Sequence, residues 1–444
     1  MTSRTRAFGS ACTVALLSLA ITGAALSHDD PAPTRVRAKP ARAVRVQLLG
    51  HLNPGGGYSG DVVAHRGYAY LSSYRGRSCP GLGVRVIDVR NPRRAVQVAA
   101  FGDAGDEPAV AGTWTEKTIV RRVQTAQFTG DLAVTTFQAC PERRPTFYGF
   151  GLYDVSNPAE PRRLALVHTE PRGSHEIWLA SARGGAWVYT AIPFSELLSS
   201  PEYPERMNNA AVPGLPDFRI FDVSDPAHPV QVGEWGAWKE LGIHPAAGRG
   251  RFLATNFTHS VITNAAATRA YLSYWDLGTV ILDVSTPSRP RYLGRTPAVD
   301  DEGNAHSAWL ARGGRVLVET HEHGLGRPYL FDVSNPARPR LLSRFGPRSR
   351  GGDPTSFTNG VHDPKVVGNR VFLSWYSRGV VVASIANARR PRVIGRFVPP
   401  PTRDPEEQLC GSGGRCALVW GVYATPTYVL ASDMIGGLWI FRLR

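Results

Sequence analysis

The strongest constraint on the fold is a phrase that the chain repeats: an apolar strand, a turn that reads Asp-Val-Ser-Asn-Pro or a close variant, and a second short apolar strand. The copies begin at Gly83, Phe150, Asp217, Gly278 and Arg327, with a degraded copy from Gly379 and a seventh, from Gly436, that the end of the chain cuts off. They recur roughly every 50 to 70 residues, a spacing typical of four-stranded propeller blades. Alternating aliphatic and aromatic residues together with proline exclude helical solenoids. We therefore predict an all-β, seven-bladed β-propeller.

The turn in the phrase predicts how each blade is built. Proline fixes its own backbone angle and restricts the residue before it, so an Asn-Pro or Asp-Pro step favours a turn between the two outer strands. The seventh copy ends after its third strand, whereas the segment from Val44, VRVQLLGHLN, has the pattern of a fourth strand. We expect this N-terminal strand to complete the last blade and close the ring, which removes exposed sheet edges.

The N-terminal region predicts export. A basic start, MTSRTR, precedes an apolar run from about Ala11 to Leu26 and a small-residue cleavage pattern at Ala25 to Ser27. We interpret residues 1–27 as a signal peptide, 28–41 as a disordered linker and 42–444 as the propeller. No later run approaches the ~20 apolar residues that a membrane span needs. The sequence thus predicts a secreted protein, free or associated with the cell wall, without a transmembrane segment.

The cysteines fit an oxidising compartment. Cys12 leaves with the signal peptide, so four cysteines remain. Cys79 and Cys140 fall in similar loops of adjacent blades, and Cys410 and Cys416 bracket a short glycine-rich loop, so we expect these two pairs to form disulfides. Free structural thiols are the alternative.

The net charge of +15 comes almost entirely from arginine. No basic run is interleaved with aromatic residues in the way that nucleic-acid readers use, so we expect no specific nucleic-acid partner. Weak attraction to anionic wall polymers is compatible with the charge. A closed propeller needs no partner for stability, so we expect a monomer.

A ring of histidines gives the sharpest functional hint. The residues that we align at the start of the inner strands, blade by blade, are Asp61, Gln124, His175, His259, His306, His362 and Trp420. Equivalent positions of a propeller surround its central channel, so the four imidazoles are expected to converge. Neutral imidazole is a common ligand of Zn, Cu, Fe and Ni.

Further residues near this register are candidates to complete or orient a metal site: Asp61, Glu176, His244, His321, Glu322, His323 and Asp363. Because strand residues alternate between faces, His321 and His323 are expected to share one face, with Glu322 on the other. A structural interpretation stands beside the metal hypothesis: a polar residue at this register can bond to a neighbouring strand, and a repeated residue can be inherited with its repeat. No nucleophile elbow, phosphate-binding glycine loop or zinc-protease helix motif is present.

The repeated phrase resembles the LVIVD repeat family, with the clearest matches around Gly83, Phe150, Phe218, Thr279 and Tyr329. This resemblance implies a β-propeller on a bacterial or archaeal surface and no single activity. The strand phrase NRVFLSWYSRG, from Asn369, is more distantly similar to the selenium-binding protein and methanethiol oxidase propellers, a resemblance that implies copper held by histidines.

Two functional hypotheses follow. The first is a noncatalytic secreted scaffold that binds a protein, a polysaccharide or a cell-wall component through its loops. The second is a metal-dependent enzyme, a copper oxidoreductase or a zinc hydrolase, with one transition metal held by His175, His259, His306 and His362.

Overall fold

The structure is a computed structural model of the 444-residue chain. It describes residues 44–140, 143, 145–193, 216–250, 254–299, 303–323, 326–346, 360–411 and 413–444. The predicted signal peptide, the linker and the first two residues of the predicted propeller, 42 and 43, lie outside the described residues.

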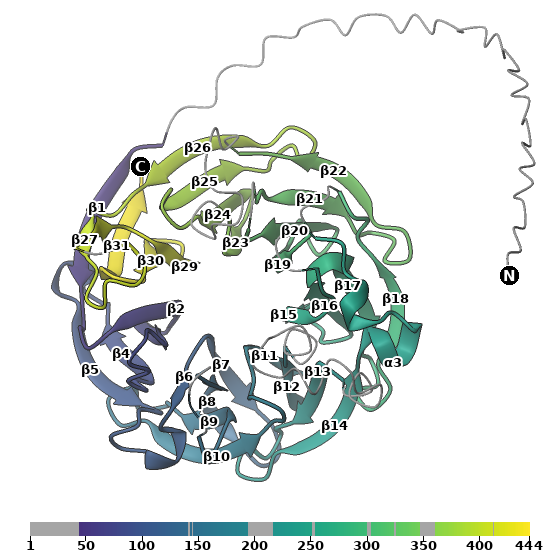
Figure 1. Cartoon of the computed structure of the whole chain (residues 1–444), viewed down its shortest axis with the longest axis horizontal. Coiled ribbons are helices and arrows are strands. Elements are labelled where there is room, and N and C mark those ends of the chain that lie inside the picture. Colours follow the sequence, from purple (N-terminus) through teal and green to yellow (C-terminus); the bar gives the residue numbers. More distant parts are fainter. Residues whose placement is uncertain are drawn as a thin grey trace, which may run out of the picture. The chain divides into compact units, whose positions relative to one another are not determined.

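Within the described residues, seven antiparallel sheets follow one another around a ring (Figure 1). Blade one comprises β2 (Tyr58–His65), β3 (Tyr68–Tyr74), β4 (Val84–Asp88) and β5 (Val96–Phe101). Blade two comprises β7 (Thr118–Gln124), β8 (Thr129–Ala139), β9 (Gly149–Asp154) and β10 (Arg162–His168), with β6 (Thr113–Trp114) added to β8. Blade three comprises β11 (Glu176–Ala182), β12 (Gly185–Ala191), β13 (Phe218–Asp222) and β14 (Val230–Trp235). Blade four comprises β15 (Thr258–Thr263), β16 (Arg269–Tyr274), β17 (Gly278–Asp283) and β18 (Arg291–Arg295). Blade five comprises β19 (Ala305–Ala311), β20 (Val316–His321), β21 (Tyr329–Asp332) and β22 (Arg340–Arg344). Blade six comprises β23 (Asp363–Val367), β24 (Arg370–Ser374), β25 (Val380–Ser384) and β26 (Arg392–Phe397).

The seventh blade joins the two ends of the described chain. It comprises β29 (Val419–Ala424), β30 (Val429–Asp433), β31 (Gly437–Leu443) and, from the other end, β1 (Val46–Leu52). The antiparallel ladder between β1 and β31 runs from the pair Val46 and Leu443 to the pair Leu52 and Leu438. The predicted seven-bladed propeller and its closure by an N-terminal strand are therefore confirmed.

Short elements outside the blades are few in the part of the chain that the structure describes. They are the hairpin of β27 (Thr402–Arg403) and β28 (Arg415–Cys416), helix α3 (Ala237–Leu241), and the 3₁₀ turns η1 (Pro92–Arg94), η2 (Pro108–Val110), η4 (Pro245–Ala247) and η5 (Trp275–Leu277). No helix among the described residues is long and apolar enough to cross a membrane.

The repeated phrase forms the turn between the third and fourth strands of a blade. In blade two, Asp154 accepts a hydrogen bond from the Ser156 amide at 3.0 Å, and Arg162 on the next strand contacts the same carboxylate at 3.3 Å. In blade five, Asp332 receives the Ser334 amide and the Arg340 guanidinium at 3.0 and 3.1 Å. A side chain that bonds to the backbone two residues on stabilises such a turn, so the repeated aspartate has a structural role.

Adjacent blades pack through apolar side chains and through a close backbone contact. The largest buried cluster joins residues of blades two to five, including Val188, Ile220 and Leu272. In the fourth strand of three blades, glycine lies against the turn of the next blade: a Cβ added at Gly50, Gly233 or Gly294 would lie 1.9, 2.0 or 2.3 Å from a proline carbonyl oxygen. The blades therefore approach too closely there for any larger residue.

Candidate metal centre in the central channel

The first strand of each blade lines the centre of the ring (Figure 1), and the residues at its start form two successive levels. The first level holds, in blade order from the second, Glu116, His175, His259, His306, His362 and Trp420. The next residue in each blade, from the first, gives the second level: Asp61, Lys117, Glu176, Ser260, Ser307, Asp363 and Gly421. Imidazoles and charged groups thus occupy separate levels of the channel.

The four histidines come together as predicted from their register, and we call them the histidine arc: His175, His259, His306 and His362. Neighbouring ring centroids are 4.5, 3.9 and 4.5 Å apart along this order. Trp420 continues the arc, with its centroid 4.1 Å from that of His362.

The predicted alignment was wrong in blades one and two. Asp61 lies at the second level, one residue beyond the register of the histidines, where it contacts Lys117. Gln124 is the last residue of β7, whereas Glu116 and Lys117 immediately precede that strand. The added strand β6 and the turn after it bring the chain to the channel earlier than the repeat spacing indicated. Glu116 therefore stands at the arc level, where its Oε1 accepts the Trp420 indole N–H at 3.0 Å and lies 3.5 Å from His362 Nε2.

Backbone carbonyls fix the tautomers of the two central imidazoles. His259 Nδ1 lies 3.1 Å from the His306 carbonyl oxygen, and His306 Nδ1 lies 2.7 Å from the His362 carbonyl oxygen. A carbonyl oxygen only accepts hydrogen bonds, so each Nδ1 carries the proton. In the neutral rings, Nε2 of His259 and His306 is then an unprotonated lone pair, as in histidines that bind a metal through Nε2.

Glu322 brings a carboxylate to the same point. Its Oε2 lies 3.4 Å from His306 Nε2 and 3.1 Å from His323 Nε2, and the Tyr376 hydroxyl donates a hydrogen bond to its Oε1. One ligand atom from each of His259, His306 and Glu322 lies within 4.8 Å of the other two. All three residues are buried. A buried group of two imidazoles and one carboxylate can hold a transition-metal ion.

Burial sets the protonation of this group. It lowers the pKa of His259 and His362 well below the ordinary value and lowers that of His175 to about 3. The pKa of Glu322 lies well below its ordinary value: burial opposes ionisation, but the charge that His306 and His323 carry when protonated outweighs it. Neutral imidazoles and an ionised carboxylate are the states that bind metal.

The protein also offers a contact within the arc that needs no metal. His175 Nε2 lies 2.9 Å from His259 Nε2, and His175 Nδ1 lies 2.6 Å from Gln138 Oε1. A proton on His175 Nε2 would satisfy the His259 lone pair. This contact supports the structural interpretation, in which the imidazoles of the arc bond to one another without a metal.

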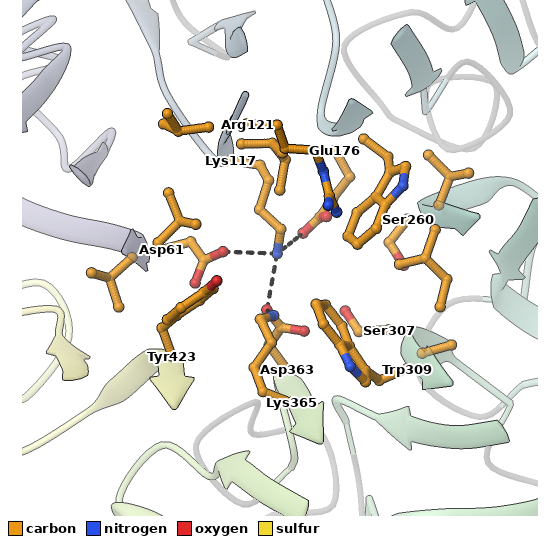
Figure 2. A pocket seen from close by; sticks show the side chains of 18 residues that line it. Asp61, Lys117, Arg121, Glu176, Ser260, Ser307, Trp309, Asp363, Lys365 and Tyr423 are labelled. Carbon is orange, nitrogen blue, oxygen red and sulfur yellow. Dashed lines mark hydrogen bonds and ion pairs between the residues drawn. The ribbon is translucent and has the colours of Figure 1, made fainter. Parts of the chain in front are cut away.

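Three predicted candidate carboxylates surround a lysine instead. Lys117 Nζ lies 2.9 Å from Asp61 Oδ2, 3.2 Å from Glu176 Oε1 and 2.9 Å from Asp363 Oδ2 (Figure 2). We call these four residues the ion cluster. Burial alone would lower the pKa of Lys117, but the three carboxylates hold it well above its ordinary value. Burial also raises the pKa of Glu176 to about 7.

The other predicted candidates lie apart. His244 Nδ1 accepts the Ala246 amide at 3.0 Å on the loop after α3. His321 Nε2 lies 3.0 Å from Glu319 Oε1, and its ring packs near Tyr329. The expected alternation of faces beyond His321 was wrong, because β20 ends at that residue and Glu322 and His323 turn together toward the arc.

Both predicted disulfides are present. Cys79 bonds to Cys140 and so links blades one and two, and Cys410 bonds to Cys416 beside the β27 and β28 hairpin.

Comparisons with known proteins agree with the fold. The LVIVD repeat family matches residues 216–235 and 270–296, so two segments of this β-propeller are similar to LVIVD repeats. No curated protein matches it. The crystal structure of Chaetomium thermophilum Raptor is similar over 91% of this chain, with 12% identity and a TM-score of 0.57, but this chain spans only 30% of Raptor's length. The computationally designed protein Ika8 is similar over 89% of this chain and 99% of its own, with 8% identity and a TM-score of 0.48. None of these matches supports the predicted similarity to selenium-binding protein and methanethiol oxidase propellers.

Proposed function

We propose that this propeller binds one transition-metal ion in its central channel through His259, His306 and Glu322. The observation that carries the proposal is the pair of Nδ1 contacts to backbone carbonyls, which leaves two Nε2 lone pairs facing one ionised, buried carboxylate. Without a cation, His306 Nε2 and Glu322 Oε2 are two acceptors 3.4 Å apart. A metal ion would satisfy both.

The donor set narrows the choice of metal. Imidazole suits Zn, Cu, Fe and Ni, and two histidines with one glutamate form the protein ligands of many catalytic zinc sites. Among the candidates from the sequence, copper and zinc, the carboxylate favours zinc, because soft thiolate and thioether ligands of the kind that select copper(I) are not among these donors. His175 is placed to serve as a fourth nitrogen donor.

A second candidate function is metal-dependent catalysis. When His175 does not bind the metal, the other three protein ligands leave one position of a tetrahedral zinc for water, which the metal would make a stronger nucleophile. Tyr376 and His323 hold Glu322 in place from two sides. A water activated in that position would serve a hydrolase. Metal binding is the test that this function must pass first.

The metal content of the purified protein tests the proposal. Inductively coupled plasma mass spectrometry should find about one equivalent of zinc or copper in the natural sequence, and Glu322→Gln and His306→Ala should each lose it. His228→Ala is the matched control, because that histidine is exposed and pairs with Asp225, away from the channel. Metal retained by Glu322→Gln and His306→Ala, or absent from all four proteins, would show that the arc is a packing feature.

We further propose that the protein works outside the cell as a binding scaffold. The basic and apolar start of the chain and the two disulfides support export, since disulfides persist in oxidising compartments. A protein, a polysaccharide or a wall polymer bound by the loops remains a prediction from the sequence. Fractionation of cells that express the whole chain should place it in the medium or the wall, and retention in the cytoplasm would contradict export.

A further inference from the structure

The channel contains a cavity beside the ion cluster. It has a volume of about 160 Å³, and the four residues of the ion cluster are part of its lining (Figure 2). Its walls come mainly from the residues two positions further along the inner strands: Val63, Ile119, Trp178, Ile262, Trp309 and Tyr423. An outer cavity of about 330 Å³ shares Val120, Arg121, Trp178 and Tyr423 with it. The walls are therefore largely apolar and aromatic, and the outer cavity gives a route inward.

Arg121 stands where the two cavities meet. Its guanidinium lies over the Trp178 ring, 4.5 Å from the centroid. Its Nε is buried and has no hydrogen-bond partner among the described residues, and no described carboxylate lies within salt-bridge distance of it. Burial lowers the pKa of Arg121, so its charge is held there at a cost in free energy that an anion would offset.

The carboxylate opposite the neighbouring Arg122 is already paired. Asp131 on β8 is contacted by His65 at 3.2 Å, Arg66 at 2.9 Å and Arg122 at 3.6 Å. Lys365 lies over the Trp309 ring at 4.7 Å, but its amine pairs with Asp363. Among the described residues around this end of the channel, Arg121 is thus the cation that remains available to a ligand.

We propose that this cavity binds a small monocarboxylate with a planar apolar body, its carboxylate held by Arg121 and its body against Trp178 and Trp309. The fork of the guanidinium matches a carboxylate bidentately. The ion cluster and Lys365 together have three carboxylates and two amines, an excess that repels the carboxylate of the ligand. The apolar end of the ligand therefore enters first, and its carboxylate stays at the mouth. The apolar walls and the small volume disfavour a polyphosphate.

Benzoate is the probe that tests this site. Isothermal titration of the full chain with sodium benzoate should show one site, and Arg121→Gln should weaken binding roughly ten- to hundredfold, the value of a charged hydrogen bond. Arg122→Gln is the matched control, because that neighbouring side chain is largely exposed and pairs with Asp131. Thermal melting of both variants checks that they fold.

Two further titrations distinguish charge-dependent binding in this cavity from binding by shape alone and from binding at the histidine arc. Benzamide, which has the same shape without the charge, should bind at least tenfold more weakly than benzoate. Glu322→Gln should bind benzoate like the natural sequence, because Glu322 belongs to the group at the other side of the ion cluster. Equal binding of benzamide, unchanged binding by Arg121→Gln, weakened binding by Glu322→Gln, or no binding of benzoate by the natural sequence would overturn the proposal.

Discussion

At the residue scale, buried charge is what distinguishes the channel from the blades around it. The chain contains four lysines, and two of them, Lys117 and Lys365, are buried in the channel. Lys117 neutralises carboxylates from three different blades, so the ion cluster ties distant parts of the ring together. Removing one partner of a buried ion pair is strongly destabilising. We therefore assign the ion cluster a structural role between the two proposed binding sites of the channel.

A buried aspartate outside the channel gives a prediction for pH. Asp217 receives hydrogen bonds from the Thr258 amide and the Tyr274 hydroxyl, and burial nonetheless raises its pKa to about 6. The folded state then holds a proton that the unfolded state has lost between about pH 4 and pH 6, so this group's contribution to stability falls as the pH rises through that window.

The expected difference can be measured against Asp217→Asn. In urea unfolding, the free energy of the natural sequence relative to Asp217→Asn should fall by about 2 kcal/mol from pH 4 to pH 7, since one pKa unit is worth about 1.4 kcal/mol and the unfolded aspartate is already partly ionised at pH 4. A difference between the two proteins that stays constant over this range would contradict the raised pKa.

At the scale of the elements, the contact between blades depends on glycine. Gly294 on β18 packs against the Pro336 carbonyl in the turn of the next blade. Gly395 occupies the same place on β26, but its nearest neighbour would be the Val44 side chain at 3.7 Å. The difference arises because blade seven has no turn between its third and fourth strands, which come from opposite ends of the chain.

Alanine at these two positions should therefore have unequal effects. Gly294→Ala is expected to destabilise the protein by about 1–3 kcal/mol through overpacking, whereas Gly395→Ala should change stability by less than about 1 kcal/mol. Thermal or urea unfolding of the two variants provides the comparison. Equal losses would mean that the backbone approach at Gly294 relaxes freely.

The turn phrase was predictable from the sequence, and the glycine contact was not. Asp154 and Asp332 bond within two residues of themselves, so their role can be inferred from local chemistry. The glycine of Gly294 recurs in equivalent strands, but local chemistry does not show that the Pro336 carbonyl of the next blade lies against it. For the same reason Glu116 and Lys117 were missed, because their place at the channel depends on the length of the insertion before β7.

At the scale of the whole molecule, closure by β1 holds the ring. The histidine register and the meeting of the imidazoles could be predicted, because repetition carries equivalent positions to one centre. The meeting of Glu322 with His306 could not, because it depends on where β20 ends. The repeat therefore predicts which residues of the inner strands lie near the axis, whereas residues that reach the axis from turns cannot be predicted from it.

Removal of β1 tests the closure. A chain that begins at residue 53 should expose the edge of β31 and aggregate or melt at a clearly lower temperature than a chain that begins at residue 44. Size-exclusion chromatography and thermal melting would compare the two. A monomeric, equally stable protein without β1 would contradict the role of the N-terminal strand.

We propose that one metal ion lies between His259, His306 and Glu322, and anomalous diffraction at the absorption edge of the metal would locate it. Crystals of the zinc-loaded protein should give one anomalous peak within about 2.0–2.2 Å of the two Nε2 atoms and a Glu322 oxygen. If the strongest peak lay at exposed histidines such as His228, with His175 Nε2 still bonded to His259 Nε2, the proposed metal site would be contradicted. The histidine arc would then only pack the blades against one another.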